Sequence, residues 1–239
     1  MSGAGPATGI PVAAMVAHCC RVLGPKLEQP AASFGLVVGC GKGDEVAYLR
    51  GAFQSPHIFG VDIETRFSPL ARASGSIAAA DALHLPFSPA IFEFAAAFHS
   101  LEHVGGAAEA LEEISRVLRP GAWLYVGVPN RKRVLGYIGS FDASTWQKAV
   151  WNLQDWVDRF WGRFRNEAGA HAGFDGDELL RLLSRRFFDV QLITGDFLRF
   201  KYACRIPARL LNILLAPPVI NYSAPSHYAI CRNAAEGTP

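Results

Sequence analysis

Short runs of apolar, β-branched residues alternate with helical stretches between residues 34 and 130. The run FGLVVG ends in glycine, whereas DEVAYLR at 44–50 has its apolar residues at helical spacing. The segment 107–118 carries acids early and an arginine late, which is typical of a helix. Strands that alternate with helices predict a parallel sheet, and right-handed crossovers make it doubly wound. The strands expected in this part are 34–39, 57–62, 76–81, 93–100 and 122–129.

The same alternation resumes near residue 174. A helix with an aspartate cap is expected at 175–186, a strand at 189–197 and a last strand at 226–233. We therefore expect a single α/β domain over residues 1–239. Its parts are an N-terminal helical region (10–33), a core (34–130), a helical insertion (131–173) and a C-terminal helix and strand pair (174–233), which contains an apolar excursion (197–222).

The insertion contains an unusually apolar helix of about 20 residues. Trp151 and Trp156 fall outside its apolar side, so the helix has more hydrophobic surface than one core contact requires. The residues that share the apolar side are Trp146, Val150, Leu153, Val157, Phe160, Trp161 and Phe164.

The excursion at 197–222 places four cations among Leu, Ile and Phe, which is the composition of an element that lies on a membrane surface. A dimer contact or a buried hairpin excursion is the alternative reading. The four cations are Arg199, Lys201, Arg205 and Arg209.

Composition narrows the class of protein. Of 239 residues, 50% are hydrophobic and 18% are charged, which excludes a disordered chain. The net charge of +2 demands no nucleic-acid partner, although residues 131–239 carry 15 Lys and Arg against 10 Asp and Glu. The longest apolar run, 206–220, is interrupted and too short to span a bilayer, and the N-terminus does not resemble a signal peptide. We expect a soluble, cytoplasmic protein.

The five cysteines are scattered and form no metal-binding spacing, so neither a disulfide framework nor a metal site is expected. The neighbours His18, Cys19 and Cys20 are interpreted as one packed helix face.

The candidate chemistry begins with GCGKG at 39–43, between the first strand and its helix. A backbone without side chains can turn tightly there and lie against a ligand. A phosphate-binding loop does not fit, because no Ser or Thr follows a Gly-Lys pair. A dinucleotide fingerprint requires a third glycine at Asp44, where the acid would repel a pyrophosphate. The pattern therefore favours a ligand without phosphates, with a plain tight turn as the alternative.

Four motifs in order resemble the class I S-adenosylmethionine-dependent methyltransferases that act on small molecules. They are LVVGCGKGDEVAYL, FGVDIE, AADALHLPFSPAIFEFAAAFHSLEHV and EISRVLRPGAWLYVGVPN, which cover residues 34–130. The resemblance implies a Rossmann-like, mostly parallel seven-stranded sheet with an antiparallel last strand, and S-adenosylmethionine as the cofactor.

The resemblance also implies the cofactor-binding residues. Gly39, Cys40, Gly41 and Gly43 form the loop that approaches the amino-acid and sugar parts of the cofactor. Asp62 ends the second strand and is expected to accept hydrogen bonds from the two ribose hydroxyls.

The adenine is expected between Ile63 and Leu83, with Asp81 and Ala82 at its polar edge. Ile63 and Leu83 are equally compatible with ordinary core positions, and Asp62 and Asp81 with acids in turns.

One position departs from the family pattern. The family has an acid two residues before the first glycine, where it helps to hold the methionine ammonium group, and this chain has Val37. Asp44, Glu45 or backbone carbonyls must then replace it, or the cofactor binds more weakly.

Methyl transfer to an alcohol or phenol requires a base, and His99 at the end of the fourth strand is the candidate catalytic residue, as well as a residue of the cofactor site. A polar residue at the rim of the site is the alternative. Glu102 is expected to form a salt bridge, His103 to pack beneath the next helix, and His171 to face solvent or the pocket mouth.

The expected partner is a small-molecule methyl acceptor, apolar, aromatic or lipid-linked, over which the insertion with Tyr137 and Phe141 forms a lid. A peripheral membrane contact through 197–222 accompanies this interpretation. The competing hypotheses are an inactive protein of the same fold that binds a partner, which Val37 favours, and an NAD-dependent oxidoreductase, which Asp44 disfavours.

Overall fold

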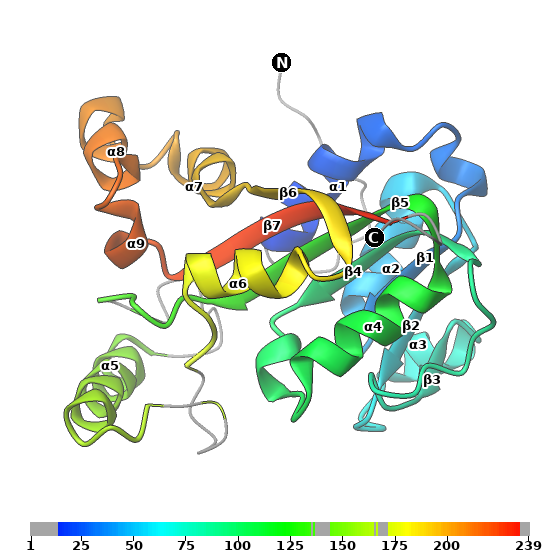
Figure 1. Cartoon of the computed structure of the whole chain (residues 1–239), viewed down its shortest axis with the longest axis horizontal. Coiled ribbons are helices and arrows are strands. Elements are labelled where there is room, and N and C mark those ends of the chain that lie inside the picture. Colours follow the sequence, from blue (N-terminus) through cyan, green and yellow to red (C-terminus); the bar gives the residue numbers. More distant parts are fainter. Residues whose placement is uncertain (1–13, 135, 137–143, 165, 167–171, 235–239) are drawn as a thin grey trace.

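The protein is a three-layer α/β structure around one seven-stranded sheet (Figure 1). The computed structural model describes residues 14–134, 136, 144–164, 166 and 172–234. The strands are β1 (Gly35–Val38), β2 (Ile58–Asp62), β3 (Ile77–Ala79), β4 (Phe92–Phe98), β5 (Leu118–Pro129), β6 (Phe187–Leu192) and β7 (Ser226–Asn233). The sheet order is β3-β2-β1-β4-β5-β7-β6, and β7 is antiparallel to both of its neighbours. The expected doubly wound, mostly parallel sheet with an antiparallel last strand is confirmed.

Helices cover both faces of the sheet. On one face, α4 and α6 pack through Leu111, Ile114 and Leu179; on the other, α1, α2, α7 and α8 bury apolar residues such as Val16 and Leu49. The α-helices are α1 (Ala14–Leu23), α2 (Asp44–Phe53), α3 (Pro69–Ala73), α4 (Ala107–Val117), α5 (Thr145–Phe160), α6 (Gly176–Leu183), α7 (Thr194–Tyr202), α8 (Ala208–Leu215) and α9 (Ile220–Ser223). No described helix is long and apolar enough to cross a membrane.

The expected helix face at His18 is confirmed. His18 and Cys19 are fully buried, and the ring of His18 lies between the Tyr125 hydroxyl (2.9 Å from Nδ1) and the Asp196 carboxylate (3.0 Å from Nε2). Burial lowers the pKa of His18 although Asp196 opposes the shift. This contact holds α1 against α7 and the sheet.

The strand expected at 189–197 is wrong in its second half, where α7 begins at Thr194. The ladder ends there because the Tyr228 amide donates to the Thr194 hydroxyl oxygen (3.0 Å) rather than to a strand partner. Phe197 and Leu198 are then buried in helical positions against α1. Their tertiary contacts override the alternation that made TGDF look extended.

The insertion also differs from the sequence pattern. Most of the apolar side of its helix α5 is exposed. The side that carries Asn152 and Asp155 faces the domain instead. The consequences of this orientation are developed below.

Buried histidines make stability sensitive to acid. Burial lowers the pKa of His227 to about 4, and His18 shifts in the same direction. Below about pH 6.5 these histidines bind protons in the unfolded chain but stay neutral in the folded chain. The free energy of unfolding therefore decreases as the pH is lowered, until about pH 4.

We expect His227 alone to account for a loss of about 2 kcal/mol between pH 7.5 and pH 5, measured by urea unfolding. The variant His227→Gln should show a smaller pH dependence, whatever its stability at pH 7.5. Gln154→Ala, at an exposed position without a titratable group, serves as the control and should leave the pH dependence unchanged. An unchanged pH dependence in His227→Gln would contradict the assignment.

Candidate active site

The site lies where the chain leaves β1, β2 and β4 at the same edge of the sheet. β1 pairs in parallel with β2 on one side and with β4 on the other, so Val38 is level with Val61 and with Ala97. The strand order reverses at this point, which is where open α/β sheets bind their ligands. The residues that follow these three positions include Gly39, Asp62 and His99.

The glycine loop is fixed by contacts with its neighbours. The amide groups of Gly39 and Cys40 both donate to the Val61 carbonyl, at 2.8 and 3.0 Å. Gly39 has a φ of +74°, and a Cβ there would lie 2.2 Å from Ser100 Cβ. Gly43 is similarly restricted by Ala71 on α3. Two of the three glycines are therefore required by packing within the protein.

Gly41 is different, because a Cβ there would meet nothing within 4 Å. Its φ of +51° and its exposure leave bare backbone facing open space. Of the three glycines, Gly41 is therefore the one whose bare backbone is open to a ligand.

Asp62 is held in place at the end of β2. One carboxylate oxygen accepts the Gly41 amide at 2.7 Å, and the other accepts the Glu64 amide at 2.8 Å. Each oxygen keeps lone-pair capacity for a second donor, so a vicinal diol can bind across the two oxygens without moving them. The fixed carboxylate therefore fits a ribose.

The expected adenine-binding residues lie on neighbouring segments. Ile63 is 73% exposed directly after Asp62, as expected of an apolar side chain that a ring would cover. The Ala80 amide donates to the Asp62 carbonyl (3.0 Å), which brings the segment carrying Asp81 alongside. Asp81 accepts the amide of Leu83 at 3.0 Å.

Ala82 and Leu83 are half-buried and pack against the core cluster on the α4 side of the sheet. Their role toward the adenine stays a prediction, since their core contacts already account for their apolar character.

Val37 stands where the family has an acid, and its side chain is fully buried in the core on the α1 side of the sheet. Glu45 in the first turn of α2 is half-buried, and burial, with Asp44 and Asp62 nearby, raises its pKa. An ammonium group beside Glu45 would compensate the cost of burying its ionised carboxylate. Burial also raises the pKa of the Cys40 thiol to about 12, which keeps it protonated and excludes it as a nucleophile.

His99 is the most unusual residue at this edge. It adopts a left-handed conformation, with a φ of +52°, and its amide donates to the Gly127 carbonyl at 2.8 Å. Strained backbone at non-glycine residues clusters at functional sites. The next residue, Ser100, donates its hydroxyl to the Val38 carbonyl (2.8 Å) and touches the glycine loop. His99 therefore lies beside the expected cofactor site.

Glu102 is buried behind His99. Its side chain is 1% exposed, and Oε1 lies 3.6 Å from Nδ1 of His99, within ion-pair distance when the imidazole is protonated. Neither carboxylate oxygen of Glu102 has a hydrogen-bond partner among the described residues. Since a buried unpartnered carboxylate is costly, its position beside an accessible imidazole indicates a functional pair. The spacing of three residues between His99 and Glu102 is the sequence signal for this contact, whereas the sequence does not show that Glu102 is buried.

Two other expectations have different outcomes. His103 is exposed rather than packed beneath α4, because the turn at Leu101–His103 directs Leu101 and Glu102 inward instead. His171, Tyr137 and Phe141 lie outside the described residues. Among the described residues there is no cluster of His, Cys, Asp and Glu that could hold a metal ion.

Comparisons with known proteins concern the segment of the chain that carries these residues. Residues 36–126 match the model of the methyltransferase domain family. The O-methyltransferase cnsE of Penicillium expansum is 34% identical over 115 residues, which cover 44% of this chain and 41% of that enzyme. The matched segment thus spans less than half of that relative's length.

Two solved structures share the fold. Phosphoethanolamine N-methyltransferase 2 of Haemonchus contortus, in complex with phosphomonomethylethanolamine and S-adenosylhomocysteine, has a TM-score of 0.55 at 14% identity, over 92% of this chain and 53% of that chain. Geranyl diphosphate C-methyltransferase of Streptomyces coelicolor, also with S-adenosylhomocysteine, has a TM-score of 0.52 at 15% identity, over 92% and 79%.

The fold is that of the two methyltransferases of known structure named above. The match to the methyltransferase domain family covers residues 36–126, which is less than half of the chain. The resemblance inferred from its motifs is confirmed, and the two solved structures of this fold hold S-adenosylhomocysteine.

The role of Asp62 is tested by cofactor binding. We expect Asp62→Ala to raise the Kd for S-adenosylhomocysteine about ten- to a hundredfold in calorimetry, since two charge-assisted hydrogen bonds are lost. Glu64→Gln is the matched control, because Glu64 is exposed and its carboxylate pairs with Arg66. Equal affinities of Asp62→Ala and the wild type would remove Asp62 from the site.

The replacement of the family's acid by Glu45 is tested with two ligands. Glu45→Gln should weaken S-adenosylhomocysteine about tenfold but leave methylthioadenosine unchanged, because methylthioadenosine lacks the amino-acid group. Asp44→Asn, one residue earlier and exposed, should affect neither ligand. Equal weakening of both ligands by Glu45→Gln would show that Glu45 acts on the loop and not on the ammonium group.

Proposed function

We propose that the protein transfers the methyl group of S-adenosylmethionine to a hydroxyl oxygen of a small molecule. The pairing of an accessible His99 with a buried Glu102, beside the glycine loop, carries this proposal. An oxygen acceptor arrives protonated and needs a base, whereas many nitrogen acceptors do not. The similarity to O-methyltransferases supports the same acceptor atom.

The residues of the site have separate roles in the proposed reaction. The glycine loop, Asp62 and Glu45 hold the cofactor in a fixed orientation at the edge of the sheet. Bound there, the cofactor supplies a methyl group on a sulfonium, and the sulfur keeps the electron pair of the broken C–S bond. Much of the acceleration comes from holding the acceptor oxygen in line with that methyl group.

His99 is the general base of the proposed mechanism. With Nδ1 facing Glu102, Nε2 is the nitrogen that takes the hydroxyl proton as the new O–C bond forms. Glu102 is a positioning residue, which fixes the orientation of the ring and stabilises the imidazolium. The left-handed backbone at His99 holds the ring in this place.

The acceptor is proposed to be apolar, aromatic or lipid-linked. Support comes from the tryptophan-rich insertion, proposed as the lid of the acceptor site, and from the apolar, cationic segment 197–222, proposed as a peripheral membrane contact. Neither role follows from the family.

An inactive protein of the same fold that binds a partner is the second candidate function, because Val37 replaces the family's acid. Cofactor binding separates the two candidates. Retained affinity for S-adenosylhomocysteine, dependent on Asp62 and Glu45, favours the enzyme.

The test of the proposed function uses methyl-labelled cofactor with a panel of phenols, aliphatic alcohols and amines, and a cell extract as a further source of acceptors. We expect a labelled methyl ether. With that acceptor, His99→Gln should lower kcat about a hundredfold or more while the Kd of S-adenosylhomocysteine is unchanged. The acid limb of the pH–rate profile should disappear as well.

Glu102→Gln should lower kcat less than His99→Gln, without a change in cofactor affinity, because it leaves the base in place. His103→Gln, an exposed neighbour in the same turn, is the control. Labelling of amines alone, or full activity of His99→Gln, would contradict the proposed mechanism.

A further inference from the structure

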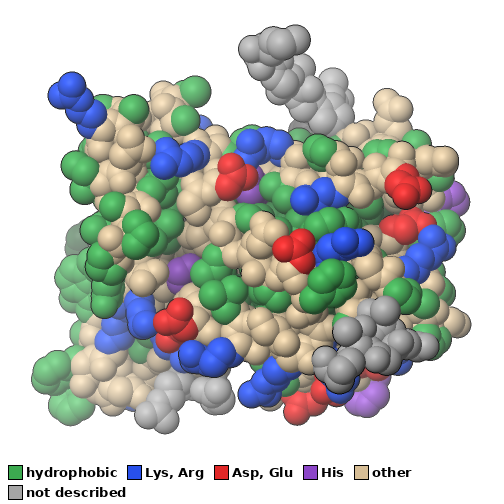
Figure 2. Space-filling model, turned by 45° about the horizontal axis from the view of Figure 1, so that its top comes forward, with side chains coloured by type: hydrophobic (Ala, Val, Ile, Leu, Met, Phe, Trp, Pro, Cys, Tyr) green, Lys and Arg blue, Asp and Glu red, His purple; other side chains and the backbone are tan. Residues whose placement is uncertain are grey.

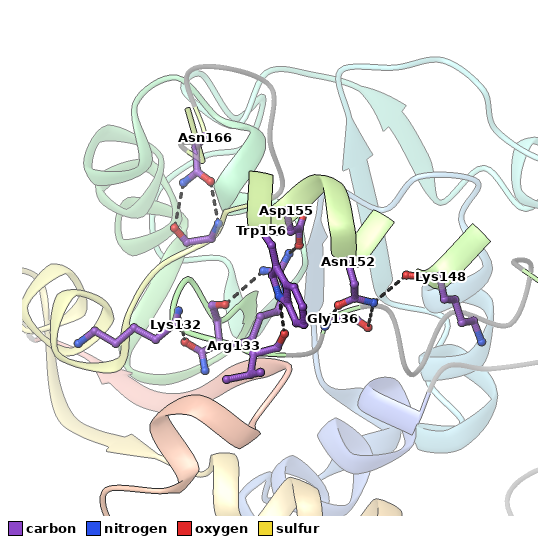
Figure 3. A network of polar contacts seen from close by, with 11 residues as sticks. Lys132, Arg133, Gly136, Lys148, Asn152, Asp155, Trp156 and Asn166 are labelled. Atoms are coloured by element: carbon purple, nitrogen blue, oxygen red, sulfur yellow. Dashed lines mark hydrogen bonds and ion pairs between the residues drawn. The ribbon is translucent and has the colours of Figure 1, made fainter. Parts of the chain in front are cut away.

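Helix α5 is attached to the domain by its polar side (Figure 3). The Asp155 carboxylate accepts from the Arg133 guanidinium at 2.8 Å, and both side chains are buried. Asn152 exchanges two hydrogen bonds with the backbone of Gly136, at 2.7 and 3.2 Å. The indole N–H of Trp156 donates to the Val134 carbonyl at 2.9 Å. These bonds fix which side of α5 faces outward.

The apolar side of α5 consequently faces outward. Trp146 is 76% exposed, Leu153 62% and Phe160 82%, and Trp161 directly after the helix is 66% exposed. Phe164 is the exception, since it is buried beneath the guanidinium groups of Arg133 and Arg159. A surface helix normally has the opposite orientation, with its apolar side against the core.

A second apolar surface lies at the same end of the molecule, where α8 and α9 stand beside the segment that carries α5 (Figure 1). Leu211 and Leu215 anchor α8 in the core, while Leu210 and Ile213 remain exposed. The Val134 amide donates to the Tyr222 carbonyl at 2.9 Å, so α9 is joined to the same residue whose carbonyl accepts from Trp156.

We name these two surfaces together the outer apolar face. It consists of Trp146, Val150, Leu153, Val157, Phe160, Trp161, Leu210, Ile213, Val219 and Tyr222, all of them exposed.

The charges around the outer apolar face are positive. The segment 197–222 contains four cations and no acid, and Arg199, Arg205 and Arg209 are exposed. The two acids of α5 are both paired, Asp155 with Arg133 and Asp158 with Arg163. Figure 2 shows hydrophobic side chains along this side of the molecule with Lys and Arg among them.

We propose that the outer apolar face docks on the surface of an anionic lipid bilayer. Exposed tryptophans and leucines beside exposed arginines, on helices too short to span, are the features of an element that lies in the membrane interface. Trp and Tyr are favoured there because their rings bury apolar area while the N–H or O–H stays near water. The cations attract anionic headgroups, and the apolar side chains insert into the membrane interface below them.

This inference goes beyond the proposed methyl transfer, since docking needs neither the cofactor nor His99. It also extends the expected contact of segment 197–222 to α5, whose orientation the sequence did not reveal.

The first experiment measures binding to vesicles by flotation. We expect the protein to float with vesicles of phosphatidylcholine and phosphatidylglycerol but not with phosphatidylcholine alone, and added salt should reverse the binding. Four of the five tryptophans belong to α5 or follow it directly, and the fifth, Trp123, is half-buried in β5. The emission should therefore shift to shorter wavelength when vesicles bind, and brominated lipids should quench it.

Variants locate the contact. Leu153→Ser and Phe160→Ser should each weaken vesicle binding about tenfold. Leu70→Ser on α3 is the matched control, because Leu70 is 67% exposed. The double variant Arg205→Glu, Arg209→Glu should abolish the preference for anionic vesicles, and Arg181→Glu, Arg185→Glu is its control. Every variant should bind S-adenosylhomocysteine as the wild type does, which separates this proposal from the proposed function.

Two results would overturn the proposal. One is a failure to float with anionic vesicles, or flotation that Leu153→Ser and Phe160→Ser leave unchanged. The other is a dimer in sedimentation equilibrium that Leu153→Ser dissociates while no vesicles are bound, which would make a second copy the occupant of this face.

Discussion

The pairing of β1 with β2 on one side and β4 on the other is the constraint on which the site depends. It places Val38, Val61 and Ala97 in one row, so the chain leaves three neighbouring strands within a few residues of each other. The glycine loop bonds back to the end of β2, and Asp62 accepts the amide of Gly41 in return. The residues expected to bind the cofactor and His99 therefore share one edge of the sheet before any ligand is bound.

The insertion uses a different kind of contact. A buried ion pair between Arg133 and Asp155 costs desolvation that its attraction barely offsets, so it is a poor source of stability but a strong determinant of orientation. Turning α5 over would take Asp155 away from the buried Arg133 and break the bonds of Asn152 and Trp156. The apolar side of α5 is exposed because these polar contacts fix the orientation of the helix.

The two halves of the molecule thus have separate tasks in our interpretation. The edge of the sheet holds the cofactor and a base, and the outer apolar face brings the protein to a lipid surface. An apolar acceptor partitions into such a surface, so docking there would raise its local concentration near His99 without altering the chemistry. The positive charge of residues 131–239 and the slight acidity of the cofactor half match this division.

The sequence by itself determined the alternation of strands and helices, the glycine loop and the place of Asp62 at the end of a strand, because these depend on local periodicity and short spacings. The class of cofactor was inferred from the resemblance of four motifs to a known family. The sequence also determined which residues of α5 share one side. Only the tertiary structure decided where that side faces, that Glu102 is buried behind His99, and that Thr194 starts a helix instead of continuing a strand. The reason is physical: a period shows which side chains lie together, but what they meet depends on contacts between residues far apart in the chain, such as Arg133 with Asp155 and Thr194 with Tyr228.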